Sequence, residues 1–171
     1  QGRGIVPEDH PATLGAYNLY PCVEDFYGTC DAVLVVGSRL RGNETLTYKL
    51  KLPSPLYSID VDDAARDRPY RPEIFVKGDA ALALEGLAQR LAGRLSVDPA
   101  FKDDIAATRK AAEQTLNGAI APYDKLVAAI QETAGRDPIW VRDVTIGNST
   151  FGNRAVLISG PNDGVHAMGG G

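Results

Sequence analysis

The chain has 171 residues, 44% of them hydrophobic, which is enough for one packed domain or parts of two and excludes general disorder. Eighteen basic and 22 acidic residues give a net charge of −4 without a dense Lys/Arg stripe, which argues against a nucleic-acid partner. The sequence has no run of about 18 apolar residues, and no signal-peptide core follows its start. We therefore expect a cytoplasmic protein with no membrane partner.

Glycine and proline divide the first part of the chain into short elements. Residues 1–20 have the composition of an extended loop, and Pro21 suits the first turn of a helix that ends near Gly28. The apolar run 32–36 is stopped by Gly37 and predicts a strand buried on both faces, which is typical of parallel sheets.

Two more strands are predicted further along, over 56–61 and 74–76. Asp79 is a good N-cap for the next helix, whose leucines lie along one apolar side. These elements together predict an α/β layered domain.

The second part of the chain predicts another α/β unit. Residues 96–121 indicate a solvated helix that connects the two units, and a second helix is expected over 122–135. Buried strands are expected over 139–141 and 156–158. Two strands cannot close a sheet of their own, so the second unit is expected to be partial. The predicted fold class is α/β with parallel, Rossmann-like layers in two partial units.

Cysteine and histidine are too few for a dedicated transition-metal site. Cys22 and Cys30 match neither a CxxC nor a zinc pattern, and we expect small buried thiols on one helical face. His10 lies in a proline-flanked loop and is expected to be a turn residue. His166 lies beside glycines and is a candidate donor to a phosphate or a substrate.

Ligands of open parallel sheets bind beyond the carboxyl ends of the strands. Six residues follow the first three predicted strands: Gly37, Ser38, Arg39, Asp60, Asp62 and Asp79. The first three suit a phosphate, or form a tight turn with an exposed arginine. Asp60 suits a ribose hydroxyl or caps the next turn, and Asp79 is a ligand or a helix cap.

The segment 143–153 follows the strand predicted over 139–141 and is rich in small hydrogen-bonding residues. Its backbone N–H groups, with Asn148 and Ser149, suit a diphosphate. The chain contains no GxxxxGK[ST], GxGxxG or nucleophile motif, so no catalytic constellation is predicted.

Five segments in a fixed order carry a family resemblance. Residues 2–11 are similar to a G-x-G-x-x-P-E-D-H-P loop, and residues 30–39 to an A-D-x-x-L-x-x-G-x-R strand. Residues 59–62 and 78–79 resemble I-D-x-D and G-D elements, and residues 139–144 resemble the strand that opens a diphosphate-binding domain. The order resembles the thiamine diphosphate-dependent enzymes of the acetolactate synthase and 2-oxoacid decarboxylase group.

This resemblance implies a division into domains. Residues 1–95 correspond to part of the central, nucleotide-binding-like domain, 96–121 to a helical linker, and 122–171 to the beginning of the thiamine diphosphate-binding domain. The family's catalytic glutamate and its magnesium-binding G-D-G to N-N segment have no counterpart in these residues. The chain by itself is therefore expected to be inactive.

The resemblance also implies two sets of site residues. The six strand-end residues would line a central-domain site that holds FAD in some members and ADP in others. Residues 16–20 and 40–43 depart from the flavin-binding pattern, which argues against FAD. The residues expected near thiamine diphosphate are Thr145, Ile146, Gly147, Asn148, Ser149, His166 and Gly170.

The implied function is that of a thiamine diphosphate- and magnesium-dependent lyase or transferase that makes or breaks C–C bonds next to a carbonyl. Its substrate would be a small 2-oxoacid or acyl donor, and the intact enzyme would be a homodimer or homotetramer. One alternative is a stand-alone module that binds ADP, FAD or coenzyme A. Another is a purely structural piece of an oligomer.

Overall fold

The computed structural model of the chain describes residues 2–135, 138–143, 147 and 151–166. They form two compact units, one of residues 24–99 and the other of residues 1–23 with 100–171. We describe each unit by itself. These units are defined by contacts within the chain. The domains predicted over 1–95, 96–121 and 122–171 are defined by the resemblance to a family, so that division stays a prediction.

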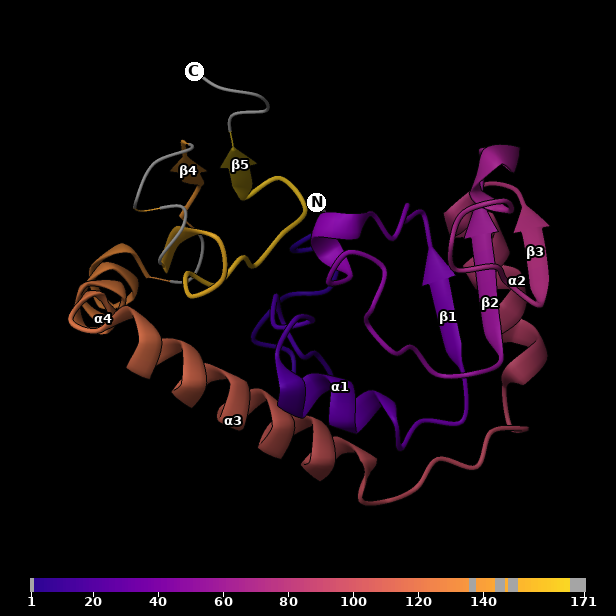
Figure 1. The fold of residues 1–171 in the computed structure, drawn as a ribbon, viewed down its shortest axis with the longest axis horizontal. Helices are drawn as coiled ribbons and strands as arrows, with labels where there is room; N and C mark the ends of the chain where they lie inside the picture. The colour runs from indigo at the N-terminus through magenta and orange to yellow at the C-terminus, as the bar shows by residue number, and fades with distance from the viewer. Residues whose placement is uncertain (1, 136–137, 144–146, 148–150, 167–171) are drawn as a thin grey trace. The chain divides into compact units, whose positions relative to one another are not determined.

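The unit of residues 24–99 contains a three-stranded parallel sheet in the order β1-β2-β3 (Figure 1). Its elements are β1 (Val33–Val36), the 3₁₀ helix η1 (Gly42–Glu44), β2 (Leu56–Asp60), the 3₁₀ helix η2 (Asp63–Ala65), β3 (Ile74–Lys77) and α2 (Ala80–Leu91). Ser58 is paired with Val35 on one side and with Phe75 on the other. All three predicted strands and the parallel sheet are confirmed.

The first strand is less buried than predicted. Val35 is buried, whereas its neighbour Leu34 is 38% exposed, and Ile74 on β3 is 54% exposed. Successive side chains of a strand point to opposite faces, and α2 contacts the sheet at β2. Within this unit, one face of β1 is therefore buried and the other is exposed, whereas the sequence predicted burial of both faces.

The leucines of α2 were expected to form an apolar side, and they do, but they do not form a core. None of the residues of α2 is buried, and Leu82 is 71% exposed. The helix begins where the sequence predicted, because the Asp79 carboxylate accepts a hydrogen bond from the Leu82 N–H at 3.0 Å.

The short helix α1 spans Pro21–Tyr27, as predicted. The prediction that both cysteines are buried on one helical face is wrong. Cys22 lies in α1, but Cys30 follows the end of the helix, and both free thiols are half-buried. The Cys30 Sγ is 3.5 Å from the Phe26 carbonyl oxygen, and burial raises the pKa of this thiol.

The other unit contains two helices and a second parallel sheet. The helices are α3 (Phe101–Ile120) and α4 (Tyr123–Ala134), and the strands are β4 (Trp140–Arg142) and β5 (Gly164–His166). Trp140 is paired with Gly164, and Arg142 with His166. Two separate parallel sheets with helices confirm the predicted α/β class.

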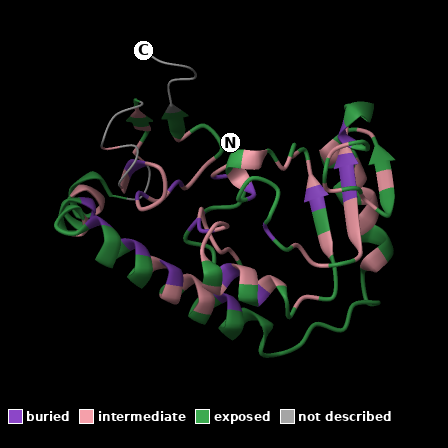
Figure 2. Cartoon of the chain, viewed as in Figure 1, coloured by how far each residue is buried: buried purple, intermediate pink, exposed green. Residues whose placement is uncertain are grey.

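One face of the helix α3 is buried. The sequence had predicted a solvated helix that only connects the two units. Figure 2 shows buried positions recurring on this helix between exposed ones. The spacing of three to four residues puts them on one face. They are Ile105, Ala112, Leu116 and Ile120.

The predicted strand over 156–158 is wrong, because this segment is irregular and the second strand is β5 instead. Val156 and Ile158 are nevertheless among the most buried side chains, at 2% and 1% exposed. Their backbone groups bond the N-terminal loop: the Glu8 N–H donates to the Ile158 carbonyl oxygen at 3.0 Å. The apolar run was a correct sign of burial, but its hydrogen bonds go to a loop rather than to a ladder.

Candidate functional site

The carboxyl ends of β1, β2 and β3 form the first candidate site, in the unit of residues 24–99. The chain turns at Gly37, whose φ of 58° lies in the left-handed region that glycine adopts readily. The Gly37 N–H donates to the Ile59 carbonyl oxygen at 2.9 Å, and the Gly78 N–H donates to the Asp60 carbonyl oxygen at 3.1 Å. These bonds continue the ladder past the last strand residues and bring the three strand ends to one edge.

Arg68 joins three of the predicted strand-end positions. Its guanidinium lies 3.6 Å from a carboxylate oxygen of Asp60 and 3.3 Å from one of Asp62. It also donates to the Ser38 carbonyl oxygen at 3.4 Å. Sequence reasoning missed Arg68, because no spacing rule connects a basic residue in the loop after η2 with the end of β1.

The two carboxylates also close local turns. Asp60 accepts from the Asp62 N–H at 3.0 Å, and Asp62 accepts from the Ala64 N–H at 3.0 Å as the N-cap of η2. The capping alternative for Asp60 is thus realised in the structure. The ribose alternative stays a prediction, and a ribose at this edge has to compete with Arg68.

No hydrogen bond or ion pair joins Arg68 to the side chains of the remaining strand-end residues, all of which the structure describes. The Ser38 hydroxyl accepts from the Leu40 N–H at 3.3 Å, and Arg39 is exposed. Asp79 caps α2, so its helix-cap alternative is also realised. The structure therefore brings Ser38, Asp60 and Asp62 together around Arg68, and it leaves Arg39 at the surface.

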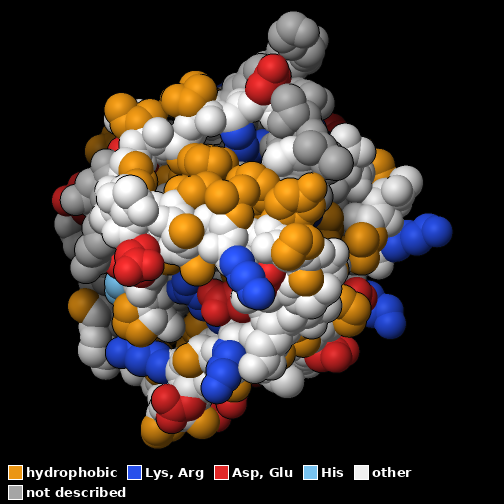
Figure 3. Space-filling model, turned by 90° about the vertical axis from the view of Figure 1, so that its left-hand side faces the viewer, with side chains coloured by type: hydrophobic (Ala, Val, Ile, Leu, Met, Phe, Trp, Pro, Cys, Tyr) orange, Lys and Arg blue, Asp and Glu red, His pale blue; other side chains and the backbone are white. Residues whose placement is uncertain are grey.

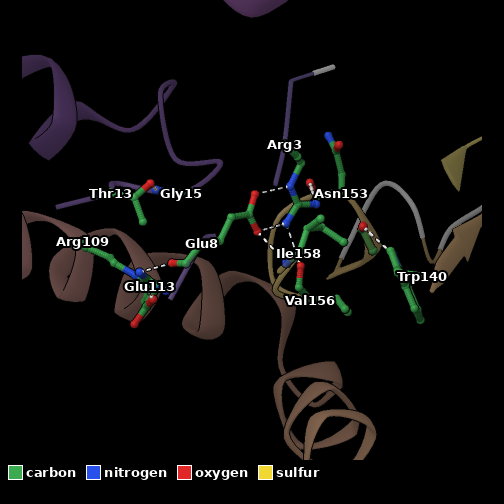
Figure 4. Close-up of polar contacts among 11 residues, drawn as sticks. Arg3, Glu8, Thr13, Gly15, Arg109, Glu113, Trp140, Asn153, Val156 and Ile158 are labelled. Atoms are coloured by element: carbon green, nitrogen blue, oxygen red, sulfur yellow. Dashed lines mark hydrogen bonds and ion pairs between the residues drawn. The ribbon is translucent and has the colours of Figure 1, made fainter. Parts of the chain in front are cut away.

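The second candidate site lies at the N-terminal loop, in the other unit, where the buried Glu8 forms an ion pair with the partly buried Arg3 (Figure 4). The Arg3 Nε donates to Glu8 Oε1 at 2.6 Å, and Nη2 donates to Oε2 at 2.5 Å. Arg3 also donates to the Asn153 carbonyl oxygen at 2.9 Å and to that of Val156 at 2.6 Å. Glu8 accepts from the Ile158 N–H at 3.0 Å.

The same loop is fixed to α3. Arg109 donates to the Glu8 carbonyl oxygen and, through Nε, to the Glu113 carboxylate at 2.8 Å. Burial, and then the charge of Glu113, raise the pKa of Tyr17 in this loop to about 12. The loop that resembles the G-x-G-x-x-P-E-D-H-P motif is therefore held in place through Arg3 and Glu8, although Ile5 and Val6 are exposed.

His10 has the turn position expected of it. Its imidazole Nδ1 accepts from the Ala12 N–H at 3.1 Å, and its backbone N–H donates to the Pro7 carbonyl oxygen at 2.9 Å. This arrangement closes a turn and requires no catalytic role for the imidazole.

Most residues predicted near thiamine diphosphate lie outside the described residues, namely Thr145, Ile146, Asn148, Ser149 and Gly170. Gly147 is described and half-buried, and its carbonyl oxygen lies near Gly152. His166 is the last residue of β5, paired with Arg142. The roles of all seven residues stay predictions.

The described part of the chain has neither a metal-ligand cluster nor a membrane-spanning helix. Among those residues there is no group of three or more His, Cys, Asp or Glu side chains able to hold a metal ion. Over the same residues, no helix has both the length and the apolar character needed to cross a membrane.

Comparison with known proteins gives one family and two relatives. The profile described as "Thiamine pyrophosphate enzyme, central domain" matches residues 1–87. The probable 2-ketoarginine decarboxylase AruI of Pseudomonas aeruginosa is 27% identical over 160 residues, which are 90% of this chain and 28% of that protein. The probable acetolactate synthase large subunit of Methanocaldococcus jannaschii is 30% identical over 93 residues, which are 53% of this chain and 16% of that protein. The chain thus spans less than a third of the length of these relatives.

Proposed function

The chain belongs to the thiamine pyrophosphate enzymes, since residues 1–87 match their central domain, and from this premise we propose that it is part of an enzyme acting on C–C bonds next to a carbonyl. The reaction is decarboxylation of a 2-oxoacid or transfer of the resulting acyl group. The 171 residues comprise part of the central domain, the helical segment after it, and the start of the thiamine diphosphate-binding domain.

One observation carries the proposal. The similarity to the probable 2-ketoarginine decarboxylase covers 90% of the chain and therefore extends beyond residues 1–87 into those that contain β4. The strands β4 and β5 form a parallel sheet separate from β1-β2-β3, as expected of a second α/β domain. The names of both relatives describe enzymes of 2-oxoacid chemistry, which supports a 2-oxoacid as the substrate class.

Thiamine diphosphate, when bound, supplies a carbon nucleophile and an electron sink for the bond that breaks. In the second unit we propose that residues 145–149, His166 and Gly170 line this cofactor. We propose no magnesium ligand within this chain.

For the central-domain edge we propose no nucleotide. The Asp60 side chain is only 11% exposed and already faces Arg68, so a ribose hydroxyl must displace a guanidinium from its carboxylate. The guanidinium also neutralises the charge of this carboxylate, which a ribose hydroxyl, being neutral, cannot do. Calorimetry with ADP, FAD and coenzyme A tests this point, and a saturable heat that Arg68→Ala alters would favour the nucleotide-binding alternative.

The test of the main proposal is the activity of the complete protein that contains these residues. We expect CO₂ release from one or more of pyruvate, phenylglyoxylate and 2-ketoarginine, with loss of activity after removal of thiamine diphosphate and magnesium and recovery when both are restored. The 171-residue chain alone serves as the negative control. A complete protein that binds no thiamine diphosphate and turns over none of these acids would defeat the proposal.

We further propose a homodimer or homotetramer for the complete protein, as the family resemblance implies. Light scattering at several protein concentrations measures this directly.

A further inference from the structure

The N-terminal loop is bonded to an irregular segment that lies about 150 residues later in the chain, in the same unit. Arg3 donates to the carbonyl oxygens of Asn153 and Val156 at 2.9 and 2.6 Å. Glu8 is paired with both backbone groups of Ile158: its carboxylate accepts from the Ile158 N–H, and its own N–H donates to the Ile158 carbonyl oxygen, each at 3.0 Å. The loop therefore satisfies four backbone groups of a segment that lies outside the helices and strands.

The loop and this segment also approach each other very closely. A methyl group at Gly4 would lie 2.0 Å from the Gly160 carbonyl oxygen and 2.8 Å from the Ile158 side chain. At Gly2, two residues earlier, the nearest atom to such a methyl group is 3.8 Å away. The contact at Gly4 therefore requires glycine, because any side chain would push the two segments apart.

The Arg3–Glu8 pair gives this contact a direction. Hydrophobic side chains gather on one face of the chain (Figure 3), but apolar contacts are non-directional. The planar Arg3 guanidinium instead presents its donors in fixed directions, to both carboxylate oxygens of Glu8 and to two carbonyl oxygens (Figure 4). The Glu8 side chain is only 5% exposed, so it acts through the bonded segment and not on a ligand.

The beginning of the segment 153–158 adjoins one residue proposed to line thiamine diphosphate. Gly152 directly precedes the segment, and a methyl group on it would lie 3.0 Å from the Gly147 carbonyl oxygen. The Gly152 carbonyl oxygen also accepts from the Trp140 Nε1–H at 3.0 Å. Gly147 is thus packed against Gly152, and a displacement of the segment displaces both.

The end of the same segment adjoins β5. A methyl group on Gly164, the first residue of β5, would lie 3.4 Å from the Ile158 side chain. This strand ends at His166, the other described residue of the set proposed to line the cofactor. Ile158, which Glu8 holds by both backbone groups, is therefore packed against the strand that carries His166.

We propose that Arg3 and Glu8 are positioning residues of the thiamine diphosphate site. By fixing the segment 153–158, they hold Gly147 and the end of β5 in the arrangement that binds the cofactor. This inference rests on the proposed function, which assigns the cofactor to these residues. Without the pair, the segment populates other arrangements, and the apparent affinity falls by the fraction of molecules that keep the binding arrangement.

Calorimetric titration of thiamine diphosphate into the complete protein, at saturating magnesium, tests the inference. Arg3→Lys keeps the charge but replaces the planar set of donors by a single ammonium group, and Gly4→Ala separates the segments without a change of charge. Each should raise the Kd about tenfold, as expected when about a tenth of the molecules keep the binding arrangement. Because the bound cofactor selects that arrangement, kcat at saturating thiamine diphosphate should stay near the wild-type value.

Two controls separate positioning from stability. Gly2→Ala, the match for Gly4→Ala, should leave the Kd unchanged. Leu116→Ala removes a buried side chain of α3 in the same unit, so it should lower the unfolding midpoint and leave the Kd unchanged. In the protein without cofactor, hydrogen exchange of the Ile158 amide should be faster in Arg3→Lys and Gly4→Ala than in Leu116→Ala.

The outcomes distinguish this inference from the proposed function. A wild-type protein that binds no thiamine diphosphate refutes the proposed function and the inference with it. If the wild-type protein binds the cofactor, an unchanged Kd in Arg3→Lys and Gly4→Ala overturns the inference alone. An equal rise of the Kd in Leu116→Ala also overturns it, because the effect would then come from stability. Where one of the two test variants does not fold, the other decides.

Discussion

Replacing Glu8 by glutamine keeps the size of the side chain and removes its charge, which leaves Arg3 without its carboxylate. The Glu8 side chain is 5% exposed and that of Arg3 is 17% exposed, so water cannot fully take over the lost interaction. Breaking a buried ion pair by removing one partner costs about 3–5 kcal/mol. Because glutamine can still accept from the Ile158 N–H, we expect the lower end, about 3 kcal/mol.

Urea unfolding followed by Trp140 fluorescence measures this loss, since Trp140 belongs to the same unit as Glu8. With a urea dependence of about 1–3 kcal/mol per molar, the unfolding midpoint should fall by about 1 M or more. The result should be a shifted midpoint with an unchanged slope.

Glu113→Gln is the matched control. Glu113 also pairs with an arginine whose side chain is 17% exposed, but Glu113 itself is 37% exposed, and the pair is of the i,i+4 type. Such pairs contribute about 0.3–0.5 kcal/mol, so the control should be nearly neutral. Equal losses in the two variants would refute the reasoning that burial of the acid determines the cost.

Three further predictions concern backbone, pH and capping. A methyl group at Gly4 would lie 2.0 Å from the Gly160 carbonyl oxygen, whereas at Gly2, which has a similar φ, the nearest atom is 3.8 Å away. Gly4→Ala should therefore lower the free energy of unfolding by about 1–3 kcal/mol more than Gly2→Ala, as chemical denaturation would show. The pKa of Tyr17 is raised to about 12 in the folded chain, so its protonated form contributes a free energy of unfolding that is fully present below pH 10 and lost as the pH rises toward 12. Chemical denaturation of Tyr17→Phe over that pH range should therefore show a smaller decrease in the free energy of unfolding. Asp79→Ala should destabilise α2 by about 1 kcal/mol, seen as faster hydrogen exchange of its first-turn amides, and unchanged exchange would contradict the capping role.

Local sequence signals succeeded wherever the structure is determined locally. The apolar runs ending at Gly37, Asp60 and Gly78 gave the three strands of one sheet, because each run has the length and composition of a strand and is closed by a residue that turns easily. The N-cap at Asp79 was equally predictable, since the bond joins residues three apart.

The candidate site at the carboxyl edge was predictable only in part. That Ser38, Asp60 and Asp62 lie near one another follows from parallel strands, whose carboxyl ends meet at one edge. That Arg68 occupies the space between them did not follow, because a loop side chain reaches its partners through the particular path of the backbone.

The error at residues 156–158 shows the same limit. The apolar side chains correctly indicated burial, but an apolar run does not reveal which groups will satisfy the backbone. Here Arg3 bonds the Val156 carbonyl oxygen and Glu8 bonds the Ile158 N–H, and these pairs are separated by 153 and 150 residues in the chain.

The sequence by itself determined the α/β class, the order of the helices and of the strands as far as β4, and the family to which the chain belongs, because these depend on local composition and on motifs in a fixed order. Only the tertiary structure decided that Arg68 faces the predicted carboxylates, that Arg3 and Glu8 secure the 156–158 segment, and that Ile158 packs against Gly164 on β5. These depend on contacts between residues distant in the chain, and no local pattern of a single sequence encodes such contacts.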